Sequence, residues 1–182
     1  ILSGLGEAIK VHYLDPLKRH ENIEQDYQLA LCNQSAMEQL IYKSLLIKKD
    51  IIQQDEFDKD YRNIMNYGHT FGHAIEAVTD YDIPHGIAVT LGMKIANELS
   101  NNLGLLPEKE LKDMARLLES NSKECRFNLI GKEEKYWSAL RRDKKNVDNR
   151  IMCILTEGYG KMKKVPIELT DDIKSCIIAT CS

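Results

Sequence analysis

Apolar residues recur every three to four positions along most of this chain, a spacing that predicts α-helices. Helices are expected over residues 7–14, 33–54, 85–101, 108–119 and 132–142, and from residue 62 to a turn at 81–84. A last helix is expected where Thr170 or Asp171 could cap it. Two apolar runs at 150–155 and 161–167 flank a glycine-containing turn and predict two strands. The pattern predicts a mainly α, multi-helix domain with a small C-terminal β-hairpin.

One predicted helix carries a polar stripe where a core-facing stripe is normally apolar. On an α-helix, Arg62, Asn66, His69 and His73 would fall within an arc of roughly 60°. A separate apolar stripe on the same segment can face the core. The polar stripe therefore indicates chemistry rather than packing.

Lys48 is a second polar residue in an unexpected place. On the helix predicted over residues 33–54, it points into the middle of the apolar side formed by Met37, Ile41, Ser44 and Ile51. A lysine there must extend to solvent, pair with an acid, or reach a ligand.

Length, charge and hydropathy narrow the class of protein. A chain of 182 residues suffices for one well-packed domain. A net charge of −3 provides no overall basic surface for nucleic acid or anionic lipid. No apolar run approaches the ~20 residues that span a bilayer. We expect a cytoplasmic protein without a nucleic-acid or membrane partner.

The histidines are candidate metal ligands. His69 and His73 lie four positions apart, a spacing that can place two imidazoles on one zinc ion. Alternatively, both are hydrogen-bonded core histidines. His85, which follows a proline-containing turn, strengthens the metal interpretation, because histidine and carboxylate ligands suit an open zinc site.

Several charged residues could bind an anion or simply face solvent. Glu7 and Lys10 share a helix face, as surface ion pairs often do. Arg62 could hold a carboxylate or phosphate through its planar fork, or pair with the acidic residues before it. Lys144 and Lys145 form part of a charge run that is typical of a solvated surface. They become an anion site only if the fold gathers them with other cations.

Together these residues resemble the dehydroquinate synthase family, and the resemblance spans most of the chain. The motifs that carry it are Gly6-Glu7-Ala8-Ile9-Lys10, Lys48, Arg62, Asn66-Tyr67-Gly68-His69-Thr70-Phe71-Gly72-His73-Ala74-Ile75-Glu76, His85-Gly86, Gly92-Met93 and Asp143-Lys144-Lys145. Their common order along the chain makes the resemblance more specific than any single motif.

The resemblance implies a role for each matched residue. It implies that the metal, Zn2+ or Co2+, is bound by Glu7, His69 and His85. The catalytic residues would be Lys10 near the reacting hydroxyls, together with Lys48 and His73. The substrate carboxylate would be held by Lys48 and Arg62, and its phosphate by Asn66, His73 and one of Lys144 or Lys145.

The resemblance also implies a reaction. The family uses NAD and zinc to convert 3-deoxy-D-arabino-heptulosonate 7-phosphate, a sugar-acid phosphate, to 3-dehydroquinate and phosphate in the shikimate pathway of aromatic amino acid biosynthesis. Its members are expected to be homodimers. The family's N-terminal NAD-binding domain should precede Ile1. Residues 1–182 are therefore expected to form a single helical metal- and substrate-binding domain that is inactive by itself.

Ile87 departs from the family pattern, which usually has glutamate after His-Gly. This removes a carboxylate that could contact a metal ligand and keeps open a related sugar-phosphate cyclase that makes aminocyclitol precursors or other carbocycles. A third possibility is a non-catalytic helical metal-binding module.

Overall fold

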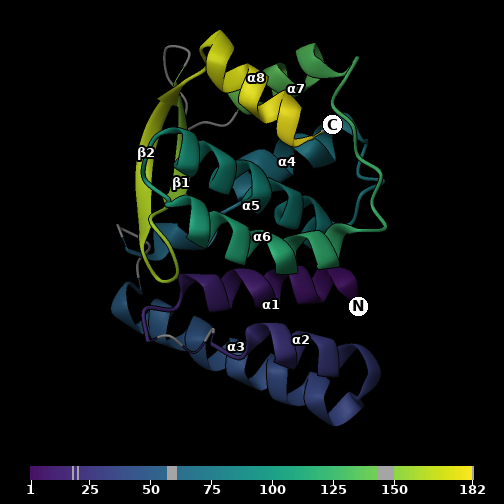
Figure 1. Cartoon of the computed structure of the whole chain (residues 1–182), viewed down its shortest axis with the longest axis vertical. Helices are drawn as coiled ribbons and strands as arrows, with labels where there is room; N and C mark the ends of the chain where they lie inside the picture. The colour runs from purple at the N-terminus through teal and green to yellow at the C-terminus, as the bar shows by residue number, and fades with distance from the viewer. Residues whose placement is uncertain (18, 20, 57–60, 143–149, 182) are drawn as a thin grey trace.

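The computed structural model describes residues 1–17, 19, 21–56, 61–142 and 150–181, which form eight α-helices, a 3-10 helix (η1) and a two-stranded sheet (Figure 1). The helices are α1 (Leu2–Leu14), α2 (Ile23–Cys32), α3 (Gln34–Gln54), η1 (Tyr61–Asn66), α4 (His69–Val78), α5 (His85–Asn102), α6 (Glu108–Ser122), α7 (Glu133–Arg141) and α8 (Asp171–Thr180). The strands are β1 (Arg150–Thr156) and β2 (Met162–Glu168). The predicted mainly α fold with a C-terminal hairpin is confirmed.

Helix α5 is the centre of the packing. It contacts α1, α4, α6, α8 and β1. It can do so because small residues, including Gly86, Ala88, Gly92 and Ala96, are buried along it and allow neighbouring backbones to approach. In Figure 1, α1 lies between α6 and the α2–α3 pair, which forms one end of the molecule.

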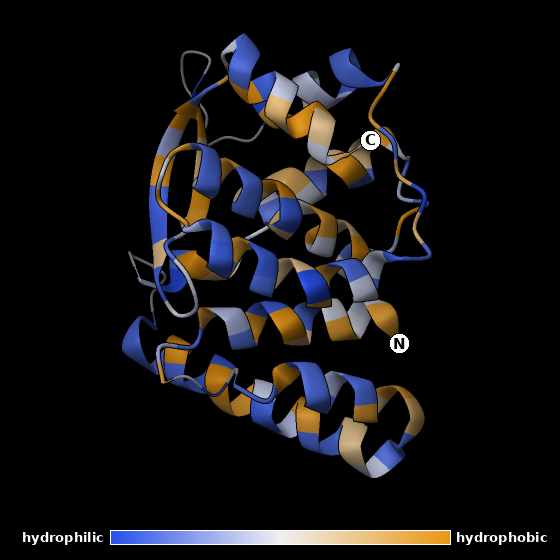
Figure 2. Ribbon diagram, in the orientation of Figure 1, coloured by the Kyte–Doolittle hydropathy of each residue, from blue (hydrophilic) through white to orange (hydrophobic). Residues whose placement is uncertain are grey.

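The hairpin lies on the side of the molecule opposite the N-terminus (Figure 1). β1 and β2 pair antiparallel, with Ile151 opposite Ile167 and Thr156 opposite Met162. The connecting turn uses positive φ angles at Gly158 (123°) and Gly160 (70°), a region that favours glycine. β1 is largely buried, whereas β2 is mostly exposed, and Figure 2 shows the outer strand as mainly hydrophilic.

Polar side chains cap the first turns of two helices. Asn33 accepts a hydrogen bond from the Ala36 amide at the start of α3, and Thr170, rather than Asp171, accepts one from the Ile173 amide at the start of α8. Among the described helices, none is both long and apolar enough to cross a lipid bilayer.

Helix α2 was not predicted. It buries Ile23, Tyr27 and Ala30, whereas most of its other residues face solvent. These three residues do have helical spacing, but so few apolar positions gave a weak periodic signal. Helix α1 also begins earlier than predicted, at Leu2 instead of Glu7.

The prediction of one continuous helix from residue 62 is wrong. Residues Tyr61–Asn66 form a 3-10 helix, and α4 begins only at His69. Between them, Gly68 adopts a left-handed conformation with φ 77°, which interrupts the α-helical hydrogen bonds. Arg62 and Asn66 therefore lie on a different element from His69 and His73.

The predicted orientation of Lys48 is also wrong. The buried side of α3 consists of Leu40, Ile47 and Ile51, while Ile41 is 49% exposed. The side formed by these three residues, which differs from the predicted one, is covered by α1 and α2. Lys48 lies at the edge of this buried side and is exposed.

Candidate metal centre and substrate pocket

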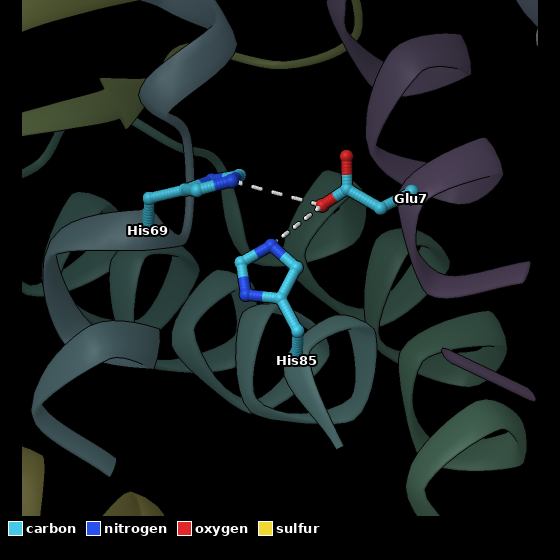
Figure 3. A group of neighbouring side chains, drawn as sticks. All are labelled: Glu7, His69 and His85. Carbon is cyan, nitrogen blue, oxygen red and sulfur yellow. Dashed lines mark ion pairs between the residues drawn. The ribbon is translucent and has the colours of Figure 1, made fainter. Parts of the chain in front are cut away.

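Glu7, His69 and His85 converge from three helices (Figure 3). Glu7 lies on α1, while His69 and His85 are the first residues of α4 and α5. Glu7 Oε1 is 3.7 Å from Nε2 of each histidine. The fold thus brings together the three residues that the resemblance assigned to the metal.

Glycines set how closely these helices approach. A Cβ atom on Gly86 would lie 1.8 Å from the Ser3 carbonyl oxygen, and one on Gly6 would lie 2.2 Å from the Gly86 carbonyl oxygen. The Gly86 amide donates to Ser3 Oγ at 2.9 Å. Because Glu7 follows Gly6 and His85 precedes Gly86, this helix crossing places both side chains at one point.

The donor set fits a divalent metal ion. Glu7 Oε1 is buried and has no hydrogen-bond partner among the described residues. Its 3.7 Å distances to the two imidazoles are too long for hydrogen bonds, but near the about 3.4 Å that separates ligands in tetrahedral zinc sites. One carboxylate and two imidazoles suit zinc or cobalt and leave a position for substrate or water.

The other ring nitrogens have acceptors that orient both imidazoles. His69 Nδ1 is 3.2 Å from the Tyr67 carbonyl oxygen, and His85 Nδ1 is 3.1 Å from Glu76 Oε1. An imidazole that donates from Nδ1 keeps Nε2 as an acceptor or metal ligand. Both Nε2 atoms then face Glu7.

Lys10 contacts both Glu7 and His69 and influences their charge. Its Nζ lies 2.8 Å from Glu7 Oε2 and 3.5 Å from His69 Nε2. Burial, followed by the Lys10 charge, lowers the pKa of His69 to about 4, so its imidazole is neutral at neutral pH. Burial raises the Glu7 pKa, but Lys10, together with His69 and His85, outweighs burial, so the Glu7 pKa is lowered.

The charge of Lys48, on α3, influences the pKa of Lys10, on α1. Burial is the main cause of the lowered Lys10 pKa, Glu7 opposes the shift, and the charge of Lys48 adds to it.

A pocket of about 470 Å³ is lined in part by His69 and His73. Its polar lining consists of Asn63, Asn66, His69, Thr70, His73, Arg142 and Lys164. Three members of the predicted polar stripe, Asn66, His69 and His73, thus share one pocket although they occupy two elements. The His73 ring lies 5.3 Å from His69 and 5.9 Å from His85, measured between ring centroids.

Other predicted site residues are not placed in the pocket. Arg62 donates from its amide to Asp55 Oδ2 at 3.0 Å and from Nη1 to the Glu56 carbonyl oxygen at 3.3 Å. It contacts the preceding acidic segment, and the described lining of the pocket does not include it. Lys144 and Lys145 lie outside the described residues.

The sequence analysis did not assign five polar residues to the site: Asn63, Thr70, Glu76, Arg142 and Lys164. Arg142 and Lys164 add positive charge to the pocket, and Lys164 Nζ donates to Asn63 Oδ1 at 3.2 Å. Lys164 arrives there only because the hairpin folds back. Glu76 contacts His85, and its helical spacing from His69 and His73 was a signal that could have identified it.

Comparisons with known proteins identify the family of this chain. A family model described as 3-dehydroquinate synthase C-terminal matches residues 4–146. A 3-dehydroquinate synthase of Helicobacter pylori (strain P12) is 39% identical over 159 residues, covering 87% of this chain and 45% of that protein. One of Thermoanaerobacter sp. (strain X514) is 33% identical over 176 residues, covering 96% of this chain and 49% of that protein.

Solved structures share the fold. A 2-deoxy-scyllo-inosose synthase complexed with carbaglucose-6-phosphate, NAD+ and Co2+ has a TM-score of 0.81 and 25% identity, covering 98% of this chain and 51% of that chain. A 2-epi-5-epi-valiolone synthase from Streptomyces hygroscopicus subsp. jinggangensis 5008 has a TM-score of 0.77 and 18% identity, covering 98% and 50%. This second match shows the fold alone.

The chain spans about half the length of the curated relatives that it matches. The family model covers most of this chain, and the relatives exceed 30% identity over nearly all of it. The chain therefore belongs to the 3-dehydroquinate synthase family and corresponds to the family's C-terminal domain.

Proposed function

We propose that this chain is the metal- and substrate-binding domain of a 3-dehydroquinate synthase. The whole enzyme would be a lyase that converts 3-deoxy-D-arabino-heptulosonate 7-phosphate to 3-dehydroquinate and phosphate, with NAD as a recycled cofactor. One observation carries this proposal: the buried, unpartnered Glu7 Oε1 faces two histidine Nε2 atoms beside a pocket with positively charged lining.

In this proposal Glu7, His69 and His85 hold Zn2+ or Co2+. A divalent ion bound there polarises neighbouring hydroxyl groups and favours their deprotonation. Lys10 lies beside the same point, and its lowered pKa makes its ammonium a better proton donor than an exposed lysine. We assign Lys10 to the reacting hydroxyls for this reason.

The anionic groups of the substrate would be held on either side of the metal. Asn66 and His73 line the pocket and would contact the phosphate, and Arg142 and Lys164 contribute further positive charge there. Fixed charges at the phosphate hold the substrate in register with the metal. One of Lys144 and Lys145 is proposed for the same phosphate.

The substrate carboxylate is assigned to Lys48 and Arg62. Support for Lys48 comes from its charge, which contributes to the lowered pKa of Lys10. Arg62 would have to exchange its contact with the Glu56 carbonyl oxygen for the carboxylate. A bidentate carboxylate is a stronger partner for guanidinium than one backbone oxygen.

We further propose that NAD binds to a separate domain, so that this chain alone is inactive. The curated relatives are about twice as long, and the similar 2-deoxy-scyllo-inosose synthase was solved with NAD+ and Co2+. A homodimer and a cytoplasmic location complete the proposal.

A chimaeric enzyme tests this function. This chain would replace the corresponding half of the Helicobacter pylori relative, and phosphate release would be measured with substrate, NAD and Zn2+. We expect release by the chimaera and none by the isolated chain, because the chain supplies the metal and substrate groups only. The same chimaera with His69→Ala should be inactive.

Two outcomes would contradict the proposal. Turnover by the isolated chain would remove the need for a second domain. A chimaera that binds NAD and Zn2+ but prefers glucose 6-phosphate, which lacks a carboxylate, would favour the alternative sugar-phosphate cyclase. The acid is expected to be the better substrate because Lys48 and Arg62 would otherwise have no carboxylate to bind.

A further inference from the structure

We propose that Glu76 is a positioning residue for His85, holding the imidazole in the tautomer and orientation that present Nε2 to the metal. This inference rests on the proposed metal site and assigns a role to a residue that does not itself bind the ion. Its basis is the contact between Glu76 Oε1 and His85 Nδ1, at 3.1 Å.

His85 needs such a partner. Its side chain is 46% exposed and it is the first residue of α5, so packing alone leaves the ring free to rotate. His69, by contrast, is 15% exposed and its Nδ1 faces the Tyr67 carbonyl oxygen. A fixed acceptor at His85 Nδ1 therefore matters more than one at His69.

Glu76 is suited to be that acceptor. Its side chain is only 10% exposed on α4, which packs closely against α5. A buried carboxylate is costly without a partner, and among the described ion pairs Glu76 takes part in one, with His85. A negative acceptor also makes the opposite nitrogen a stronger metal ligand than a backbone carbonyl would.

The neighbouring Ile87 does not compete with Glu76 as a hydrogen-bond acceptor for His85. Ile87 is buried and has no polar atom in its side chain, so it cannot accept a hydrogen bond from His85. The carboxylate that contacts His85 comes from α4.

A competing arrangement would use Glu76 as a ligand of a second ion. His73, Glu76 and His85 also place their ligand atoms within 4.8 Å of one another. However, Nδ1 of His85 cannot donate a proton to Glu76 and bind an ion at once. Of these two groups of described residues, only the one around Glu7 therefore binds an ion, through His85 Nε2.

The test compares Co2+ binding by the full chain with Co2+ binding by its Glu76→Gln variant. Binding is measured by visible absorption and by competition with a chelator. Glutamine keeps the side-chain size but removes the charge, and we expect roughly 10- to 100-fold weaker binding. Glu98→Gln is the matched control, since Glu98 is a partly buried carboxylate on α5. Its Co2+ affinity should equal that of the unsubstituted chain.

Imidazole 15N NMR of the metal-free chain tests the tautomer without any substitution. His85 should carry its proton on Nδ1, and a proton on Nε2 would overturn the inference even if Glu76→Gln failed to fold. Unchanged Co2+ affinity in Glu76→Gln, or two ions per chain with one lost in the variant, would also overturn it. Failure of the unsubstituted chain to bind Co2+ would instead overturn the metal site, and this inference with it.

Discussion

Replacing His69 with alanine is expected to weaken Co2+ or Zn2+ binding by more than about 100-fold, because substitution of residues that merely support metal ligands already costs about 10- to 100-fold. The variant loses one of three converging donors, while Glu7 and His85 remain. Isothermal titration calorimetry with Co2+ or Zn2+ would measure the loss, and circular dichroism would verify that the helices remain.

His73→Ala is the matched control. His73 lies one turn further along α4 and its ring is 5.3 Å from that of His69, but it does not belong to the group around Glu7. Its removal should leave metal affinity within a few-fold of the unsubstituted chain and weaken phosphate binding instead. Equal loss of metal binding in both variants would refute the assignment of ligands.

Gly86→Ala is expected to destabilise the chain by on the order of 3 kcal/mol or more, because its Cβ would overlap the α1 backbone. The new atom would lie 1.8 Å from the Ser3 carbonyl oxygen, and neither backbone can yield without separating α1 from α5. Urea unfolding should show a lower midpoint. Metal affinity should fall too, since the same crossing brings Glu7 to His85.

Gly4→Ala provides the comparison for the same chemical change. Gly4 lies on α1, is exposed, and would place its Cβ in open space. Alanine there should be neutral or stabilising by up to about 1 kcal/mol. A Gly86→Ala midpoint equal to that of Gly4→Ala would show that the α1–α5 crossing is more adaptable than its geometry implies.

Elements whose signals are local were predictable from sequence. Helix α6 buries Leu111, Met114 and Leu118 at helical spacing, and the hairpin turn has glycine at both positions with positive φ. These patterns depend on backbone geometry within a few residues. Neighbouring elements therefore did not alter them.

Predictions that depended on the direction of a helix face were less successful. The buried side of α3 is set by α1 and α2, so Lys48 could not be placed by counting positions along its own helix. The polar stripe was interrupted at Gly68, whose left-handed conformation starts a new helix. Asn66 and His73 still meet in one pocket because the break is short and both elements line it.

Most helices of this protein, and the carboxylate, imidazoles and lysine of the proposed site, could be identified from the amino-acid sequence. The folded structure was needed to see that Glu7, His69 and His85 meet, that Lys164 enters the pocket and that Glu76 contacts His85. The physical reason is that helix propensity acts over a few residues. The crossings that bring distant residues together depend on close backbone contacts between whole helices.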